Sequence, residues 1–340
     1  MDNIYDFSEC FVFPINDYDG RERKERIIYN GDNYLMKFRN NATGKTDLFS
    51  FQTNNIFSEY VGCHIIETLG IPVQKTLLGT YKGEVVVACK DFTFPGVHLA
   101  EFSDLSNSFI SKSKLSPHPD LDSVLSCYEE RFGAGPSDPL RKNFWDIFII
   151  DSFIGNFDRH AGNWGFLVDD KTGSVKPSPI YDCGSCLHPS LAEHALDEVM
   201  SNVTEIDARI YRFPSSSILY KGQKIPYFDF ISSLQNEECT SALLRVYPKI
   251  SMDKISQVID ATPIISETRK QFYKTMLSQR YTKILTFSYE KALSLNVGKS
   301  DTGSIPLKSS LSAQIHSASA RAADSHAFPD TPVKAPDPER

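Results

Sequence analysis

The stretch from Gly155 to Asn163 carries an acid and an amide at the spacing of a phosphoryl-transfer site. Asp158 is followed, after four intervening residues, by Asn163, and a second acid, Asp182, ends the apolar run 179–181. A kinase uses one carboxylate to receive the proton of the acceptor hydroxyl. It uses an amide oxygen and another carboxylate to hold Mg²⁺ against the phosphates of ATP. The pattern predicts Asp158 as the catalytic base and Asn163 and Asp182 as metal ligands.

This spacing alone is weak evidence for a kinase site, because a polar turn between two hydrophobic segments can have the same sequence pattern. A lysine and a glutamate upstream strengthen the prediction. Lys37 lies in a strand-like run in which Met36 and Phe38 should point to the opposite face. Glu59 lies in an apolar helical segment, where a charge needs a partner. A strand-to-helix Lys–Glu ion pair fixes the phosphate-binding lysine of kinases, so we expect Lys37 and Glu59 in the nucleotide site.

Two residues of the loop have more than one reading. Arg159 and His160 follow the expected base directly, and either can contact phosphate or hold the loop in place. We group them with the catalytic residues and keep structural support as the alternative. Asp151 precedes the loop by two helical turns, so a structural hydrogen bond is its expected role.

The phosphates of the nucleotide should be covered by the charged segment 16–24, with Lys24 as a phosphate-binding cation. The signal is weak, because this segment has one glycine and no Walker A pattern, and an exposed charged loop is the alternative. The adenine should meet backbone groups of residues 87–91, among them Cys89 and Lys90.

The elements that must position these residues follow from turn chemistry and periodicity. Asn30-Gly31 predicts a hairpin over 26–38, and a second hairpin is expected over 76–89. Between them, apolar residues at helical spacing predict a helix over 55–69. Strand, strand, helix, strand, strand is the order of a kinase small lobe.

The second half of the chain reads as mostly helical. An apolar helix over 143–154 should be buried and should position the loop that follows it. The other expected elements are strands at 164–168 and 175–181, a short helix at 121–131, and helices within 191–295, most clearly 252–259 and 266–294. From 296 to 340 the chain is rich in Ser, Ala, Pro and Asp, so we expect this tail to be disordered.

Composition excludes some classes of function. The 340 residues are 41% hydrophobic, with a formal charge of −7 and a pI near 5.7. An acidic chain is not expected to bind nucleic acid or anionic membranes generally. No apolar run reaches the roughly 20 residues of a membrane span, and no signal peptide is recognisable at the amino terminus.

The cysteines indicate a reducing compartment. Their number is odd and no secretory signal is recognisable, so we expect reduced thiols and a cytoplasmic location. The cysteines are Cys10, Cys63, Cys89, Cys127, Cys183, Cys186 and Cys239. The lone Cys-x-x-Cys over 183–186 lacks a second pair to complete a zinc site, so we expect structural thiols beside Asp182 rather than a redox pair.

With these residues in this order, the chain resembles the HipA-like serine/threonine kinases over residues 10–295. The motif Asp-Arg-His-x-x-Asn over 158–163 and the Tyr-Asp pair at 181–182 carry the resemblance. It implies an α+β, bilobal kinase fold, with a small β-rich N-lobe over 1–90 and a larger, mostly helical C-lobe over 91–295. It also implies ATP with Mg²⁺, transfer to a protein Ser or Thr, and autophosphorylation.

The resemblance implies a phosphate loop that often contains Ser and whose autophosphorylation can switch the enzyme off. Residues 16–26 of this chain contain no Ser or Thr, so this mode of self-inhibition is not expected. An antitoxin partner is not assumed, because the amino-terminal subdomain of longer HipA proteins is not recognisable. The resemblance leaves export by a signal-independent route open.

Two other functions remain open at this point. A phosphoinositide or small-molecule kinase shares the same motif, and a non-catalytic ATP-binding protein would act by interaction alone. A basic or apolar membrane patch would favour the lipid kinase, and the acidic balance speaks against it.

Overall fold

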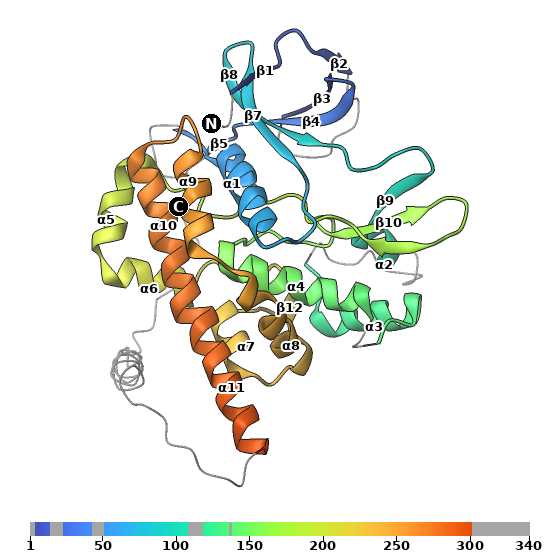
Figure 1. Ribbon diagram of the computed structural model, residues 1–340, viewed down its shortest axis with the longest axis vertical. Helices are drawn as coiled ribbons and strands as arrows, with labels where there is room; N and C mark the ends of the chain where they lie inside the picture. The colour runs from blue at the N-terminus through green and yellow to red at the C-terminus, as the bar shows by residue number, and fades with distance from the viewer. Residues whose placement is uncertain (1–3, 14–22, 43–50, 108–117, 136–137, 301–340) are drawn as a thin grey trace, which may run out of the picture. The chain divides into compact units, whose positions relative to one another are not determined.

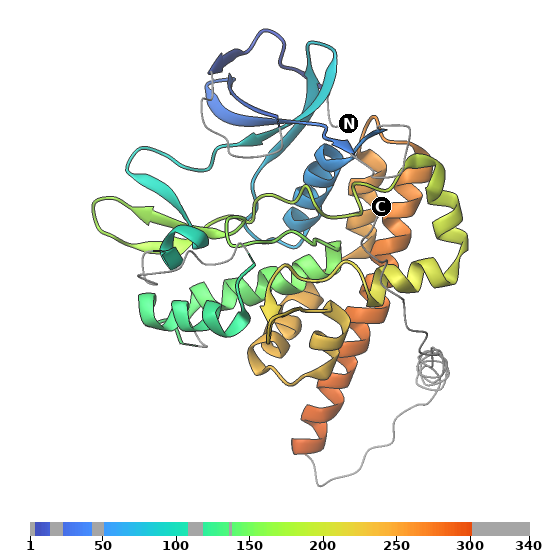
Figure 2. The same cartoon turned by 180° about the vertical axis from the view of Figure 1, so that it is seen from behind.

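The structure is a computed structural model that describes residues 4–13, 23–42, 51–107, 118–135 and 138–300. Residues Met1–Ser294 form one compact unit, and Leu295–Arg340 form a second. In the first unit, Figures 1 and 2 show a β-sheet at one end, helices at the other, and helix α1 beside the sheet. This is the predicted α+β architecture.

A six-stranded sheet with the order β1-β7-β8-β4-β3-β2 forms the amino-terminal part. Its strands are β1 (Tyr5–Asp6), β2 (Phe11–Phe13), β3 (Lys24–Tyr29), β4 (Asp32–Phe38), β7 (Thr76–Tyr81) and β8 (Glu84–Lys90). Both predicted hairpins are confirmed. Asn30 and Gly31 have φ of 49° and 82°, and Lys82 and Gly83 have φ of 50° and 86°. Two consecutive positive φ angles define the type I′ turn that the sequence predicts at Asn30-Gly31.

The two faces of this sheet have different neighbours. Met36 and Phe38 are buried in a small core with Ile27 and Val86, on the face away from α1. Lys37 alternates with them and faces the other way, towards α1 (Asn55–Thr68). The predicted alternation along β4 is therefore confirmed, and it directs the lysine to the interior of the unit.

Helix α1 connects the sheet to the helices. It packs against β7, β8 and α9 (Met252–Ala261), and nearly all of its residues are buried. A small sheet of β5 (Asn41–Ala42) and β6 (Phe51–Gln52) precedes it.

A three-stranded sheet, β11-β10-β9, follows in the chain. It consists of β9 (Val97–Glu101), β10 (Gly165–Asp169) and β11 (Val175–Pro177), and α2 (Phe102–Asn107) and α3 (Leu121–Phe132) lie between β9 and β10 in sequence. The sequence did not predict β9. The strand predicted over 175–181 ends at Pro177, because Pro177 and Pro179 supply no N–H to a ladder. Ile180 instead bridges Val73.

Helix α4 (Pro139–Ile154) is the buried helix that the sequence predicts before the loop. It begins four residues earlier than expected, because Asp138 caps Leu140 N–H at 2.8 Å and Pro139 suits the first helical position. Gly155 ends it with φ of 68°, a conformation that favours glycine. The helix packs against α8 (Glu237–Val246) and α10 (Glu267–Arg280).

The other elements complete the helical part. They are η1 (Glu193–Ala195), α5 (Leu196–Ser201), α6 (Val203–Tyr211), β12 (Leu219–Tyr220), β13 (Gln223–Lys224), α7 (Tyr227–Ser233), η2 (Tyr247–Lys249), the π-helical η3 (Tyr281–Thr286) and α11 (Phe287–Ser300). The helix continues to Ser300, past the predicted tail boundary at 296, because each residue added to a formed helix adds a hydrogen bond. The rest of the predicted tail lies outside the described residues.

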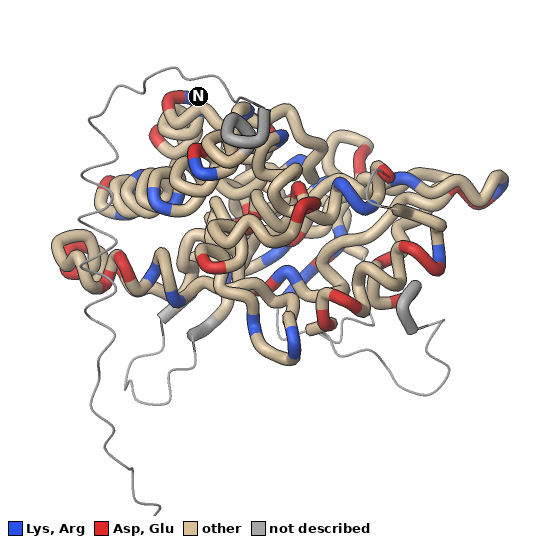
Figure 3. Tube along the Cα trace, turned by 90° about the horizontal axis from the view of Figure 1, so that it is seen from below, with Lys and Arg blue, Asp and Glu red and all other residues tan. Residues whose placement is uncertain are grey.

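Charged residues of both signs follow one another along the chain (Figure 3). Within the ranges that the structure describes, none of the helices combines the length and the apolar character that a membrane span needs.

Candidate active site

Lys37 joins two acids that are far from it in sequence. Its Nζ donates to Glu59 Oε2 and to Asp182 Oδ1, each at 2.9 Å, although these residues are 22 and 145 positions away. The lysine and Glu59 side chains are only 7% and 1% exposed, and Asp182 is 29% exposed. The predicted ion pair between strand and helix is present, and Asp182 is the member of this cluster that faces solvent.

The charges of this cluster stabilise one another. Burial opposes the charged form of Lys37, but the Asp182 and Glu59 carboxylates outweigh it and raise the pKa of the lysine well above its usual range. Burial likewise opposes ionisation of Asp182. The Lys37 and Lys24 cations outweigh that effect and hold the pKa of Asp182 well below its usual range. Both groups are charged at neutral pH.

Arg159 holds the loop from inside the protein. Its guanidinium donates to both oxygens of Asp151, at 3.0 and 3.1 Å, and to the carbonyl of Asn163 at 2.8 Å. It also donates to the carbonyl of Tyr181. The Arg159 and Asp151 side chains are 5% and 2% exposed. One buried cation therefore ties α4, the loop and the segment before Asp182, and the structural hydrogen bond expected of Asp151 is present.

The backbone of the loop directs Asp158 and Asn163. Asn156 Oδ1 accepts from the Asp158 N–H at 3.1 Å, and Asn163 Nδ2 donates to the Asp158 carbonyl at 2.8 Å. The Asp158 side chain is partly exposed, as a group that meets substrate must be. With its amide nitrogen engaged, Asn163 presents its Oδ1, and no donor among the described residues hydrogen bonds to that oxygen.

The segment after Asp182 packs directly on α1. The Cys183 N–H donates to Glu59 Oε1 at 3.1 Å, and the Cys186 thiol donates to the Ser58 carbonyl at 3.3 Å. A Cβ on Gly62 would lie 2.9 Å from Cys186 Sγ, so this close approach requires glycine. All the cysteines are unpaired, and burial raises the pKa of the Cys186 thiol well above its usual range. The Cys-x-x-Cys thiols therefore serve packing beside Asp182.

Asp182 itself has a backbone conformation that few residues adopt. Its φ is 56°, in the left-handed region, where Asp and Asn are better tolerated than most residues. Such strain is concentrated at functional sites and persists only where the surroundings fix it. Here the surroundings are the ion pair with Lys37 and the Arg159 contact to the preceding carbonyl.

Two predicted site residues, His160 and Lys24, lie at the edge of this cluster. His160 Nδ1 accepts from the Gly162 N–H at 3.1 Å, which gives the imidazole a role within the loop. Lys24 is opposite Lys37 in the β3–β4 register and lowers the pKa of Asp182, so it lies on the side of the site where it is expected. Residues 16–22 of the predicted phosphate cover lie outside the described residues.

The residues predicted to contact adenine, Cys89 and Lys90, already take part in the pairing of the sheet. Cys89 lies inside β8, pairs with Leu35 on one side and Thr76 on the other, and is fully buried. The Lys90 N–H donates to the Lys75 carbonyl at 2.8 Å. The Lys90 side chain pairs with Asp32 at 2.6 Å. The Lys90 N–H is therefore in use and Cys89 is enclosed between two strands, so we do not carry Cys89 and Lys90 into the proposed site.

One acid of this region was missed by the sequence reasoning. Glu101 ends β9, and its Oε2 would lie 3.1 Å from a Cβ on Gly162, so the carboxylate lies against the loop. Burial raises the pKa of Glu101, and the negative charges of Asp104 and Asp182 raise it further. A hydrogen bond from Ser103 acts in the opposite direction but does not outweigh them. No motif marks Glu101, because the β9–β10 pairing that brings it there joins segments more than 60 residues apart.

The fold and this cluster together define a class, that of the bilobal protein kinases. The chain belongs to the HipA-like family, whose HipA-like C-terminal domain matches residues 20–210. It is 41% identical over 303 residues to the serine/threonine-protein kinase CtkA of Helicobacter pylori (strain J99 / ATCC 700824). The match covers 88% of this chain and 92% of that protein.

Solved structures agree. The crystal structure of a Helicobacter pylori proinflammatory kinase CtkA matches with a TM-score of 0.77 and 41% identity, over 86% of this chain and 100% of that one. HipA of Shewanella oneidensis MR-1, solved with HipB and operator DNA, matches with a TM-score of 0.53. It is 17% identical, over 82% of this chain and 69% of that chain, and shares the fold alone.

Proposed function

We propose that this chain transfers the γ-phosphoryl group of ATP to a Ser or Thr hydroxyl of a protein, with Mg²⁺ as the divalent metal. The observation that carries the proposal is Lys37 Nζ at 2.9 Å from both Glu59 and Asp182. This contact brings the phosphate-binding lysine, its helix partner and the metal-binding acid to one point. The 41% identity to a serine/threonine-protein kinase supports the same activity.

The residues then have distinct roles. Lys37 presents a fixed cation to the phosphates, and its pairing with Glu59 keeps that cation in place before substrate arrives. Asp158 receives or orients the proton of the acceptor hydroxyl. Arg159 is a positioning residue, because its buried guanidinium donates to Asp151 and to backbone carbonyls and so holds the loop on α4. His160 supports the turn at Gly162.

The proposed metal ligands fit Mg²⁺ chemically. Mg²⁺ takes oxygen ligands, usually one or two from the protein, and keeps several waters. Asn163 offers its Oδ1, and Asp182 offers Oδ2, since its Oδ1 accepts from Lys37. When bound, Mg²⁺ would neutralise charge that develops on the phosphates.

We also propose that residues 1–90 and 91–295 act as the two lobes. The first includes α1 and ends with β8, and the second holds the loop, Asp182 and the other helices. A cytoplasmic location stays a prediction from the sequence. The lipid-kinase alternative is not favoured, because the curated relative is a protein kinase. A non-catalytic role is not favoured either, since binding alone does not require a catalytic base beside the metal ligands.

Asp158→Asn tests the proposal. We expect the variant to fold normally and to lose phosphotransfer by at least about 100-fold, because a positioned base contributes roughly 10²–10⁴ in rate. The assay incubates the protein with Mg-ATP and a generic protein substrate and measures added phosphate by intact mass, with EDTA as the metal-free arm. Asp253→Asn, at an exposed acid on α9, is the matched control. Wild-type activity in Asp158→Asn would refute the assignment.

A further inference from the structure

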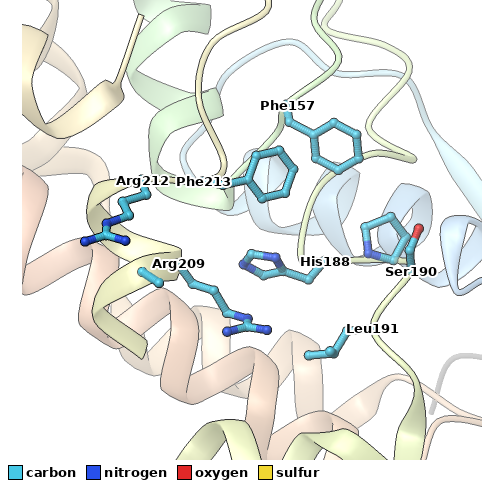
Figure 4. Close-up of a pocket in the computed structure, with 9 residues that line it drawn as sticks. Phe157, His188, Ser190, Leu191, Arg209, Arg212 and Phe213 are labelled. Carbon is cyan, nitrogen blue, oxygen red and sulfur yellow. The ribbon is translucent and has the colours of Figure 1, made fainter. Parts of the chain in front are cut away.

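A cavity of about 410 Å³ opens beside the catalytic loop, on the side of α6. Figure 4 shows the residues around it. Its apolar walls include Phe157, Phe213 and Leu191, and its polar lining includes His188, Arg209 and Arg212. Its volume is within the range of pockets that accept ligands, roughly 300–1,000 Å³. None of the residues discussed for phosphoryl transfer lines it.

His188 is buried in this cavity with an unused polar atom. The residue is 9% exposed, and its Nε2 has no hydrogen-bond partner among the described residues. Burial, with the neighbouring Arg280 and Arg209 cations, lowers the pKa of His188 to about 3. The imidazole is therefore neutral at pH 7 and can donate one hydrogen bond. In Figure 4 the ring lies between Phe213 and Arg209. A buried polar atom without a partner is costly, so this nitrogen is available to a ligand or a water that enters the cavity.

Two arginines give the cavity a positive charge in a chain of net charge −7. Arg209 uses one guanidinium nitrogen, Nη1, on the carboxylate and the carbonyl of Glu205. Its other nitrogens have no partner within the described ranges. Arg212 is exposed, and its side chain has no ion pair with a described residue. The cavity thus has one arginine without an ion pair to a described residue, further guanidinium donors on Arg209, and aromatic walls.

The position of the cavity ties it to the reaction. Phe157 is bonded directly to Asp158, the proposed base, and its ring packs 5.2 Å from that of Phe213. His188 follows Asp182 by only a few residues, and both His188 and Leu187 have positive φ, of 55° and 56°. An extended peptide advances about 3.3–3.6 Å per residue. A substrate residue within about three positions of a hydroxyl at Asp158 can therefore reach this cavity.

We propose that the cavity binds an acidic side chain of the protein substrate, a Glu or Asp within about three residues of the phosphorylated Ser or Thr. The inference rests on the proposed kinase function. The carboxylate would take hydrogen bonds from Arg209 and His188, with Arg212 at the rim, and its methylene groups would pack between Phe157 and Phe213. Charge-assisted bonds of this kind are stronger than neutral ones.

The test is a set of peptide pairs with one acceptor Ser. Each pair carries Glu or the isosteric Gln at one position from −3 to +3, on an otherwise neutral background. For wild type we expect one or two positions at which Glu lowers KM by about tenfold relative to Gln, with kcat nearly unchanged. A group that binds substrate and transition state equally changes KM alone.

The variant Arg209→Gln with Arg212→Gln should raise the KM of the Glu peptide about tenfold, to the value of the Gln peptide. Glu205→Gln is the matched control, because it removes the same ion pair but leaves Arg209 cationic, so the preference for Glu should remain or increase. Arg212→Gln alone, at an exposed position, gives a variant that should fold if the double variant does not. It should weaken the preference.

The outcomes separate the two claims. Equal kcat/KM for Glu and Gln at every position, with phosphotransfer intact, would overturn the acidic subsite and leave the kinase function standing. A preference for Glu that persists in the arginine variants would place the acid elsewhere and overturn it too. If wild type phosphorylated neither the peptides nor a generic protein, the proposed function itself would fail.

Discussion

Replacing Arg159 with Met should damage both the stability and the catalysis of this protein. Met is unbranched and apolar, so it replaces the aliphatic stem of the arginine but has no guanidinium. It therefore leaves Asp151 buried, 2% exposed, without its cation. It also removes the donor to two backbone carbonyls. One belongs to Asn163, a proposed metal ligand, and the other to Tyr181, the residue before the second proposed ligand.

The magnitude follows from the burial of this pair. Because both side chains are almost fully buried, solvent screens their interaction little. Removing one partner of a buried pair costs about 3–5 kcal/mol. That is a large part of the roughly 5–15 kcal/mol by which domains are stable. Replacing Asp151 as well, with Leu, removes the uncompensated charge. The double variant should therefore lose less than the sum of the single changes, with a coupling of about 1–3 kcal/mol.

The assay is urea unfolding followed by circular dichroism, with the free energy of unfolding extrapolated to water. Lys270→Met is the control. It breaks a pair with Glu267, whose side chain is 86% exposed, while the Lys270 side chain is 15% exposed. Met preserves most of the packing of the lysine stem, so the change should cost less than about 1 kcal/mol. Phosphotransfer should fall in kcat more than in the KM for ATP, because the loop is displaced while Lys37 is untouched. Additive single changes, or Arg159→Met with wild-type kcat, would refute the reasoning.

Three further outcomes are expected. Asp182→Asn should lower the free energy of unfolding most above about pH 4, the ordinary pKa of Asp, and progressively less below it. The folded-state pKa of Asp182 is depressed, so its stabilisation is lost as pH falls; a difference that stays constant down to pH 3 in urea unfolding would contradict this. Gly62→Ala should destabilise the protein by about 1–3 kcal/mol, because its Cβ would meet Cys186 Sγ at 2.9 Å; a gain in melting temperature would show that the contact relaxes. Deleting residues 301–340 should leave the melting temperature nearly unchanged and, if the Ser-rich tail is the autophosphorylation target, should abolish self-labelling seen by phosphosite mapping. A large loss of stability would show that the tail packs against the rest of the protein. Phosphorylated residues found only outside the tail would exclude the tail as the target.

Much of the amino-terminal part could be read from local patterns. Turn chemistry at Asn30-Gly31 places the first hairpin, and alternation along β4 decides which way Lys37 faces. The helix over 55–69 is predicted from its periodicity and begins at Asn55 as expected. These features depend on neighbours within a few residues, which is the range over which backbone propensity and side-chain period act.

Other features depend on contacts between distant segments and could not be predicted. The sequence could not choose between catalysis and support for Arg159, because its partners come from α4 and from the segment before Asp182. It placed adenine contacts at Cys89 and Lys90, where sheet pairing with other strands occupies the backbone.

By itself, the sequence determined which residue types stand at the spacing of a phosphoryl-transfer site, and the local elements that carry Lys37, Glu59 and Asp158. Only the tertiary structure decided that Asp182 meets Lys37 across 145 positions, that Glu101 lies against the loop, and that a cationic cavity lies beside the base. The physical reason is that burial and charge pairing depend on which surfaces come together. That choice is made by the packing of the whole core and not by any short stretch of residues.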